Sequence, residues 1–132
     1  MSDPHRALLD TNVIIALFAG EPNILKRTAE CTETYIAVTV LGELYYGAFR
    51  SVRQEENLAR LHLLATRNVI LPCVVETATR YGSIRTKLAA KGRPIPENDI
   101  WIAAVAMQHD LTLLTRDVHF CEVEELAVEL LE

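Results

Sequence analysis

Short apolar runs and longer runs of helical spacing succeed each other along the chain. Short β-type runs predict strands at residues 7–9, 34–37, 68–72 and 111–114, and a last strand is expected within residues 126–131. Helical spacing or length predicts helices over residues 13–18, 24–33, 38–49, 58–65, 74–90 and 97–107. Because helices alternate with strands, the pattern indicates an α/β domain with a mainly parallel sheet.

Two of these helices carry more specific predictions. Residues 38–49 are apolar on nearly all sides, so we expect a buried helix in which Gly42 and Gly47 allow close approach of a neighbour. The helix over residues 97–107 should begin with Asn98 or Asp99 as its N-cap, since both residue types cap helices well. Its small apolar residues should pack closely on the sheet.

Length and composition favour one domain spanning residues 1–132. Half of the residues are hydrophobic and the mean hydropathy is +0.14, which leaves apolar surface for a partner. Asp10 and Asn12 interrupt the first apolar run, so neither a signal peptide nor a membrane span is predicted. Cys31, Cys73 and Cys121 show no disulfide or metal spacing, and we expect buried thiols in a cytoplasmic protein.

The charge distribution limits how this chain could bind nucleic acid. Its net charge of −5 excludes binding by overall positive charge. Residues 77–96 nevertheless carry only basic charges, whereas residues 121–132 carry only acidic ones. A polyanionic substrate would therefore need a bound cation or this local basic patch, although Lys87 and Lys91 are interpreted as an exposed helix face.

Four carboxylates stand where a globular chain has little reason to place charge. Asp10 and Asp117 each follow an apolar strand, Asp99 opens a small-residue helix, and Glu43 interrupts an apolar one. Each has an ordinary alternative, as a helix cap, a turn residue or an exposed helix position. Together they predict one acidic pocket, which needs a cation because crowded carboxylates repel each other. Oxygen ligands of this kind favour Mg²⁺ or Mn²⁺.

Four segments match one known family in order and spacing over nearly the whole chain. They are Leu9-Asp10-Thr11-Asn12, the helix of Glu43, the segment of residues 94–104 that contains Asp99, and Leu114-Thr115-Arg116-Asp117. With these segments the chain resembles the PIN-domain ribonucleases, most closely the VapC toxins of bacterial type II toxin–antitoxin (VapBC) pairs. The resemblance implies a PIN-like, Rossmann-like three-layer domain, with a five-stranded sheet of order 3-2-1-4-5 and helices on both faces.

The resemblance also implies roles for individual residues. The four acids would bind one or two Mg²⁺ or Mn²⁺ ions and form the catalytic site. Asn12 and Thr115 would hydrogen-bond to ligands or waters, and Arg85 would touch the acids or a substrate phosphate. The implied reaction is hydrolysis of phosphodiester bonds in structured RNA such as tRNA, which leaves 3′-hydroxyl and 5′-phosphate ends and inhibits translation.

Family precedent further implies a homodimer and a cognate VapB-like antitoxin. The antitoxin would lay an apolar segment over helices such as residues 41–49 and 58–65, with a basic side chain in the acidic pocket. Glu97 departs from the family, since many relatives have glycine there, and it either adds a fifth acid or starts the helix. His119 follows Asp117 by two residues and could approach the pocket, whereas the other histidines are expected at the surface.

Two other functions stay open at the level of sequence. Acidic α/β phosphatases or phosphotransferases also place an aspartate after the first strand, but one such class needs a second aspartate two residues later, where this chain has Asn12. A non-catalytic PIN-like binding module is the other alternative. The presence of all four acids argues against it, and loss of activity in an Asp10→Asn variant would exclude it.

Overall fold

The computed structural model describes residues 3–132. Five strands form one sheet: β1 (Asp3–Leu9), β2 (Glu33–Ala37), β3 (Val69–Leu71), β4 (Leu111–Thr115) and β5 (Val128–Leu130). Their order is β3-β2-β1-β4-β5, and every neighbouring pair is parallel. The predicted α/β class and strand order are therefore confirmed.

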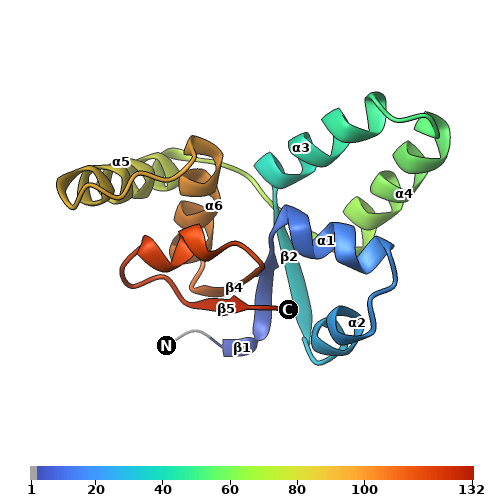
Figure 1. Ribbon diagram of the computed structural model, residues 1–132, viewed down its shortest axis with the longest axis horizontal. Coiled ribbons are helices and arrows are strands. Elements are labelled where there is room, and N and C mark those ends of the chain that lie inside the picture. The colour runs from blue at the N-terminus through green and yellow to red at the C-terminus, as the bar shows by residue number, and fades with distance from the viewer. Residues whose placement is uncertain (1–2) are drawn as a thin grey trace.

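Six helices and one 3₁₀ turn accompany the sheet within residues 3–132. They are α1 (Thr11–Phe18), α2 (Pro22–Ala29), α3 (Val38–Phe49), α4 (Gln54–Arg67), α5 (Val75–Ala90), α6 (Glu97–Gln108) and η1 (Val118–Glu122). In Figure 1, α5 and α6 lie on one side of β1 and β2, and α1, α2 and α4 lie on the other. Helices α3 and α6 come from opposite sides and contact each other. The prediction of helices on both faces is confirmed.

The core is centred on the two middle strands. Leu8 and Leu9 of β1 and Leu113 and Leu114 of β4 are almost completely buried, because a parallel sheet is covered on both faces. On the β4 side, the predicted small-residue face of α6 is also buried, including Ala103 and Ala104. Burial of these side chains holds the carboxyl ends of β1 and β4 next to each other, in the register Leu9 opposite Leu114.

Helix α3 differs from the prediction of a fully buried helix. Val40 and Leu44 are buried, but Tyr46 and Phe49 are 64% and 58% exposed. Gly42 and Gly47 also do not serve close packing within the chain, since a Cβ at either position would meet nothing within 4 Å. The apolar character on all sides of α3 therefore reflects one buried face and one uncovered apolar face.

Two further predictions need correction. Helix α6 begins at Glu97 with Pro96 as its N-cap, so Asp99 is the third helical residue and not the cap. The proline ring holds φ of Pro96 at −54°, close to the helical value, and the helix starts at the next residue. Cys73 and Cys121 are exposed and Cys31 is half-buried, so none is the buried thiol expected from composition.

Within residues 3–132, no helix is long and apolar enough to cross a membrane.

Candidate functional site

Asp10 lies at the corner where β1 ends and α1 begins. Its Oδ1 accepts a hydrogen bond of 2.8 Å from the backbone N–H of Thr11, so it does cap the helix. Its backbone N–H donates to the carbonyl oxygen of Leu114 at 3.0 Å, which ties the corner to β4. The side chain is only 5% exposed. Helix capping and a place at the sheet edge are therefore two roles of the same carboxylate, not alternatives.

Thr115 connects the two strand ends. Its buried hydroxyl donates to Asp10 Oδ2 at 2.6 Å and accepts from the backbone N–H of Asp117 at 3.0 Å. Asn12, the other predicted supporting residue beside Asp10, accepts from the backbone N–H of Arg116 at 3.2 Å through its Oδ1. Both residues therefore fix the loop that carries Asp117 against the loop that carries Asp10.

Glu43 and Asp99 reach the site from helices on the two sides of the sheet. Glu43 is an exposed residue of α3, and its Oε1 accepts a hydrogen bond from the side-chain amide of Asn98 at the start of α6. Asp99 follows directly in that helix. The sequence alone indicated Asn98 only as a possible helix cap, and its position next to Asp99 was the one signal that it could belong to the site.

The electrostatics show that the four acids share one site. Burial, followed by the charges of Asp10, Asp117 and Glu43, raises the pKa of Asp99 to about 6. Burial also raises the pKa of Asp10, although hydrogen bonds from Thr115 and Thr11 oppose the rise, and the charge of Asp117 adds to it. Glu43 is exposed as a whole residue, but its carboxyl is partly desolvated, and this desolvation and then the charge of Asp10 raise its pKa. The acids are close enough to destabilise each other's ionised forms.

No lysine or arginine among residues 3–132 forms an ion pair with any of the four acids. The ring of His119 does contact one of these acids, with its Nδ1 3.0 Å from Asp117 Oδ1. A donor set of several carboxylates and few compensating charges fits a divalent cation with oxygen ligands. One ligand atom each from Asp99, Asp117 and His119 lies within 4.8 Å of the others, which is compact enough for a shared ion.

Arg85 and Glu97 interact with each other instead of the four acids. Arg85 Nη1 donates to the hydroxyl of Tyr81 at 2.7 Å and lies 4.0 Å from Glu97 Oε1, while the Tyr81 hydroxyl donates to the same oxygen at 3.0 Å. Tyr81 in turn stacks on Trp101, with 4.1 Å between ring centroids. Glu97 thus starts α6 with its carboxylate already engaged, on the flank of the site.

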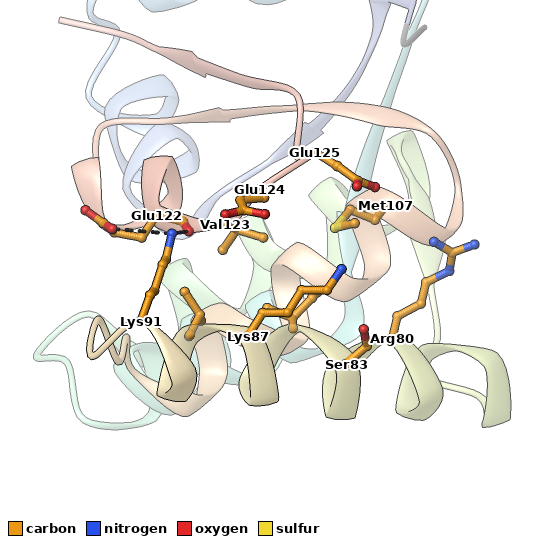
Figure 2. A pocket seen from close by; sticks show the side chains of 11 residues that line it. Arg80, Ser83, Lys87, Lys91, Met107, Glu122, Val123, Glu124 and Glu125 are labelled. Atoms are coloured by element: carbon orange, nitrogen blue, oxygen red, sulfur yellow. Dashed lines mark hydrogen bonds and ion pairs between the residues drawn. The ribbon is translucent and has the colours of Figure 1, made fainter.

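A separate cavity of about 220 Å³ lies between α5 and the segment around η1. Figure 2 shows Arg80, Lys87 and Lys91 on one wall and acidic side chains, including Glu122, on the other. Lys91 pairs with Glu122 at 3.6 Å, and Arg80 pairs with Glu76 at 3.5 Å. None of the four acids lines this cavity. The predicted basic patch is therefore partly neutralised by its neighbours and lies outside the acidic site.

Comparison with known proteins agrees with this fold and site. Residues 7–126 match the PIN domain model, and the chain belongs to the PIN-domain family. Within that family its relatives are VapC proteins. It is 32% identical to Ribonuclease VapC2 of Rickettsia felis over 92% of this chain and 95% of the relative. It is also 31% identical to the tRNA(fMet)-specific endonuclease VapC of Shigella flexneri, over 83% and 85%.

Solved structures give the same result. The crystal structure of VapBC2 from Rickettsia felis, bound to a DNA fragment from their promoter, contains a chain that superimposes with a TM-score of 0.86 at 30% identity, covering 96% of this chain and 99% of that one. DNA-bound VapBC from Salmonella typhimurium gives a TM-score of 0.87 at 30% identity, with 94% and 96% covered. The resemblance to VapC toxins predicted from the four acidic motifs is confirmed.

The raised pKa of Asp99 predicts how stability depends on pH when no divalent ion is present. A carboxyl whose pKa is higher in the folded state favours folding when protonated, so its contribution falls as the pH rises from about 4 to about 6. In EDTA at pH 7.5, Asp99→Asn should therefore be more stable than the unmodified protein. Because solvent screens this partly exposed group, the gain should be only ~1 kcal/mol. Urea unfolding of the variant and of the unmodified protein at pH 4.5 and 7.5 measures this difference in the free energy of unfolding.

Glu55→Gln, at an exposed position of α4, is the matched control and should leave the pH dependence unchanged. An Asp99→Asn variant with the same stability as the unmodified protein at both pH values would show that repulsion at the site is unimportant.

Proposed function

We propose that this chain is a divalent-metal-dependent endoribonuclease toxin of the cytoplasm, with Asp10, Glu43, Asp99 and Asp117 as its metal-binding and catalytic residues. The observation that carries the proposal is the convergence of four carboxylates, unpaired with any lysine or arginine in the described chain, at the carboxyl edge of a parallel sheet. Ligands bind at such an edge in open α/β sheets, where strand order reverses. The family relationship to proteins named ribonucleases supports RNA as the substrate.

A bound Mg²⁺ or Mn²⁺ ion would neutralise these carboxylates, contact phosphate oxygens and lower the pKa of a water molecule. The residues of the chain supply the geometry. Asp10 is fixed by Thr11 and Thr115, and the loop of Asp117 is fixed by Thr115 and Asn12, so both carboxylates are oriented before substrate arrives. Preorganised groups of this kind need little rearrangement during the reaction.

Glu43 is suited to move the proton of the attacking water. Its Oε1 accepts a hydrogen bond from Asn98, and Oε2 would accept the proton. The water oxygen then bonds to phosphorus in line with the 3′-oxygen, whose bond to phosphorus breaks. The leaving 3′-oxygen takes up a proton, so the products carry 5′-phosphate and 3′-hydroxyl ends. The enzyme forms no covalent intermediate.

We further propose structured RNA, and tRNA in particular, as the substrate. One relative is named a tRNA(fMet)-specific endonuclease, and it covers most of this chain at 31% identity. The net charge of −5 and the ion pairs on α5 give the chain little positive surface for binding long RNA by charge alone. Recognition should therefore depend on the shape of a folded RNA and on its phosphate at the acidic site.

Cleavage of tRNA tests this function. Protein freed of any antitoxin is incubated with a pool of tRNA and rRNA, with Mg²⁺, with Mn²⁺ and with EDTA. We expect discrete metal-dependent cuts in tRNA with 5′-phosphate ends, and a loss of at least about 100-fold in rate for Asp10→Asn and Asp99→Ala. Glu55→Gln is the control and should cleave normally. Equal cleavage by the Asp10→Asn variant would contradict the assigned site, and absence of cleavage by folded, metal-loaded protein would favour a non-catalytic binding module.

We also propose that a VapB-like antitoxin covers the groove beside the acids and that the toxin itself is a homodimer. The groove has a volume of about 260 Å³ and is lined by apolar residues of α1, α3 and α4, among them Ile15, Leu44 and Leu61. Thr11 and Glu43 line the same groove, so it continues to the acidic site. Related chains are found in VapBC complexes, which supports an antitoxin as the occupant.

The groove also accounts for the open space beside Gly47 of α3, whereas the exposed Tyr46 and Phe49 do not line it. Gly47 lines it with open space beside its Cα, and Ile15 on α1 is 56% exposed. An apolar antitoxin segment would bury these positions, and a basic side chain at its end would lie among the acids, where it would replace the cation. The antitoxin would thus inhibit in two ways: its apolar segment would fill the groove, and its basic side chain would neutralise the carboxylates in place of the cation.

Ile15→Glu should weaken binding of the co-expressed antitoxin by about 10-fold or more, because it puts a charge into the apolar groove. Leu25→Glu, on α2, is the matched control, since Leu25 is similarly exposed at 46% but does not line the groove. Titration calorimetry, in which the separated toxin variant and antitoxin are recombined, measures the antitoxin affinity of each variant. Equal affinity of the two variants would place the antitoxin elsewhere.

A further inference from the structure

His119 lies closer to the acids than sequence spacing alone can show. It is the second residue of η1, and its backbone N–H donates to Asp117 Oδ1 at 2.9 Å. The same turn brings its ring Nδ1 to 3.0 Å from that oxygen. The side chain is more than half exposed, so the ring approaches the acids from the solvent side.

The spacing of the donor atoms matches one metal ion. Two ligands at right angles around an ion, each at about 2.1 Å, are about 3 Å apart, and two opposite ligands are about 4.2 Å apart. The Nδ1 atom of His119 and Oδ1 of Asp117 are 3.0 Å apart, and the full set with Asp99 spans no more than 4.8 Å. A small adjustment of exposed side chains would bring all three donors to a single octahedral ion.

We propose that His119 is a nitrogen ligand of the ion that Asp99 and Asp117 hold, and that it makes the site prefer Mn²⁺ to Mg²⁺. The inference rests on the metal site of the proposed function and deepens it. Mg²⁺ is a hard ion that binds oxygen donors and retains its waters. Imidazole nitrogen binds first-row transition ions more strongly than it binds Mg²⁺, so a site that includes it favours Mn²⁺ over Mg²⁺ more than a site made of carboxylates alone.

A ring that only orients Asp117 by a hydrogen bond is the alternative. That arrangement would leave the ion with oxygen ligands only, and removing the ring would lower the affinities for Mn²⁺ and Mg²⁺ to a similar extent. The two arrangements therefore differ in the ratio of Mn²⁺ to Mg²⁺ affinity and in whether nitrogen is bonded to the ion.

Both quantities can be measured on the full chain without any RNA. Mn²⁺ is titrated into antitoxin-free protein, free Mn²⁺ is followed by electron paramagnetic resonance, and Mg²⁺ is added as competitor. For His119→Ala, we expect the Mn²⁺ affinity to fall by about 10-fold and the Mg²⁺ affinity to change by less than about 3-fold. Pulsed electron paramagnetic resonance of bound Mn²⁺ should show hyperfine coupling to an imidazole ¹⁴N nucleus, and this coupling should be absent in His119→Ala.

His5→Ala is the matched control, since His5 is an exposed histidine of β1 at the end of the strand opposite to Asp10. It should retain both affinities and the nitrogen signal. Equal losses of Mn²⁺ and Mg²⁺ affinity in His119→Ala, or bound Mn²⁺ without nitrogen coupling, would overturn the inference about His119 alone. Failure of the unmodified protein to bind either ion would overturn the metal site of the proposed function as well.

Discussion

Repulsion among four carboxylates at one edge of the sheet is the constraint on which the site depends. Asp10 is almost fully buried, and the pKa of Asp10, Glu43 and Asp99 is raised by burial and by neighbouring charge. The fold tolerates this arrangement because the backbone that carries Asp10 and Asp117 is held in place. The apolar core of β1 and β4 and the hydrogen bonds of Thr115 hold it. In the proposed function, a divalent cation would relieve this repulsion and become part of the site.

In the proposed function, the same arrangement couples catalysis to inhibition. Glu43 belongs both to the acidic site and to the apolar groove between α1, α3 and α4, and Thr11 is shared in the same way. A partner that fills the groove therefore meets the acids without any change in fold. In the proposed complex, one surface provides apolar binding energy and the adjacent carboxylates provide a place for a basic side chain, so affinity and inhibition come from contiguous contacts.

The α/β class and the places of Asp10 and Asp117 could be predicted because they depend on local patterns, whereas the strand order came only from the resemblance to PIN-domain ribonucleases. An apolar strand followed by an acid at a helix start puts that acid at the carboxyl edge of a parallel sheet. Contacts between distant segments could not be predicted in this way. The hydrogen bond from Asn98 to Glu43 joins residues 55 positions apart in the sequence, and the hydrogen bond from Thr115 to Asp10 joins residues 105 positions apart. The uncovered face of α3 was misinterpreted as core because composition does not distinguish a buried face from one that awaits a partner.

Anomalous diffraction from crystals of the antitoxin-free protein soaked in Mn²⁺ tests the central claim most directly. The account predicts an anomalous peak at the edge of β1 and β4, with carboxylate oxygens of Asp10, Asp99 and Asp117 within ion-binding distance or bridged to it by water, and no such peak in Asp10→Asn crystals. Crystals of the unmodified protein in which Mn²⁺ binds only elsewhere, with the four carboxylates still clustered, would contradict the account.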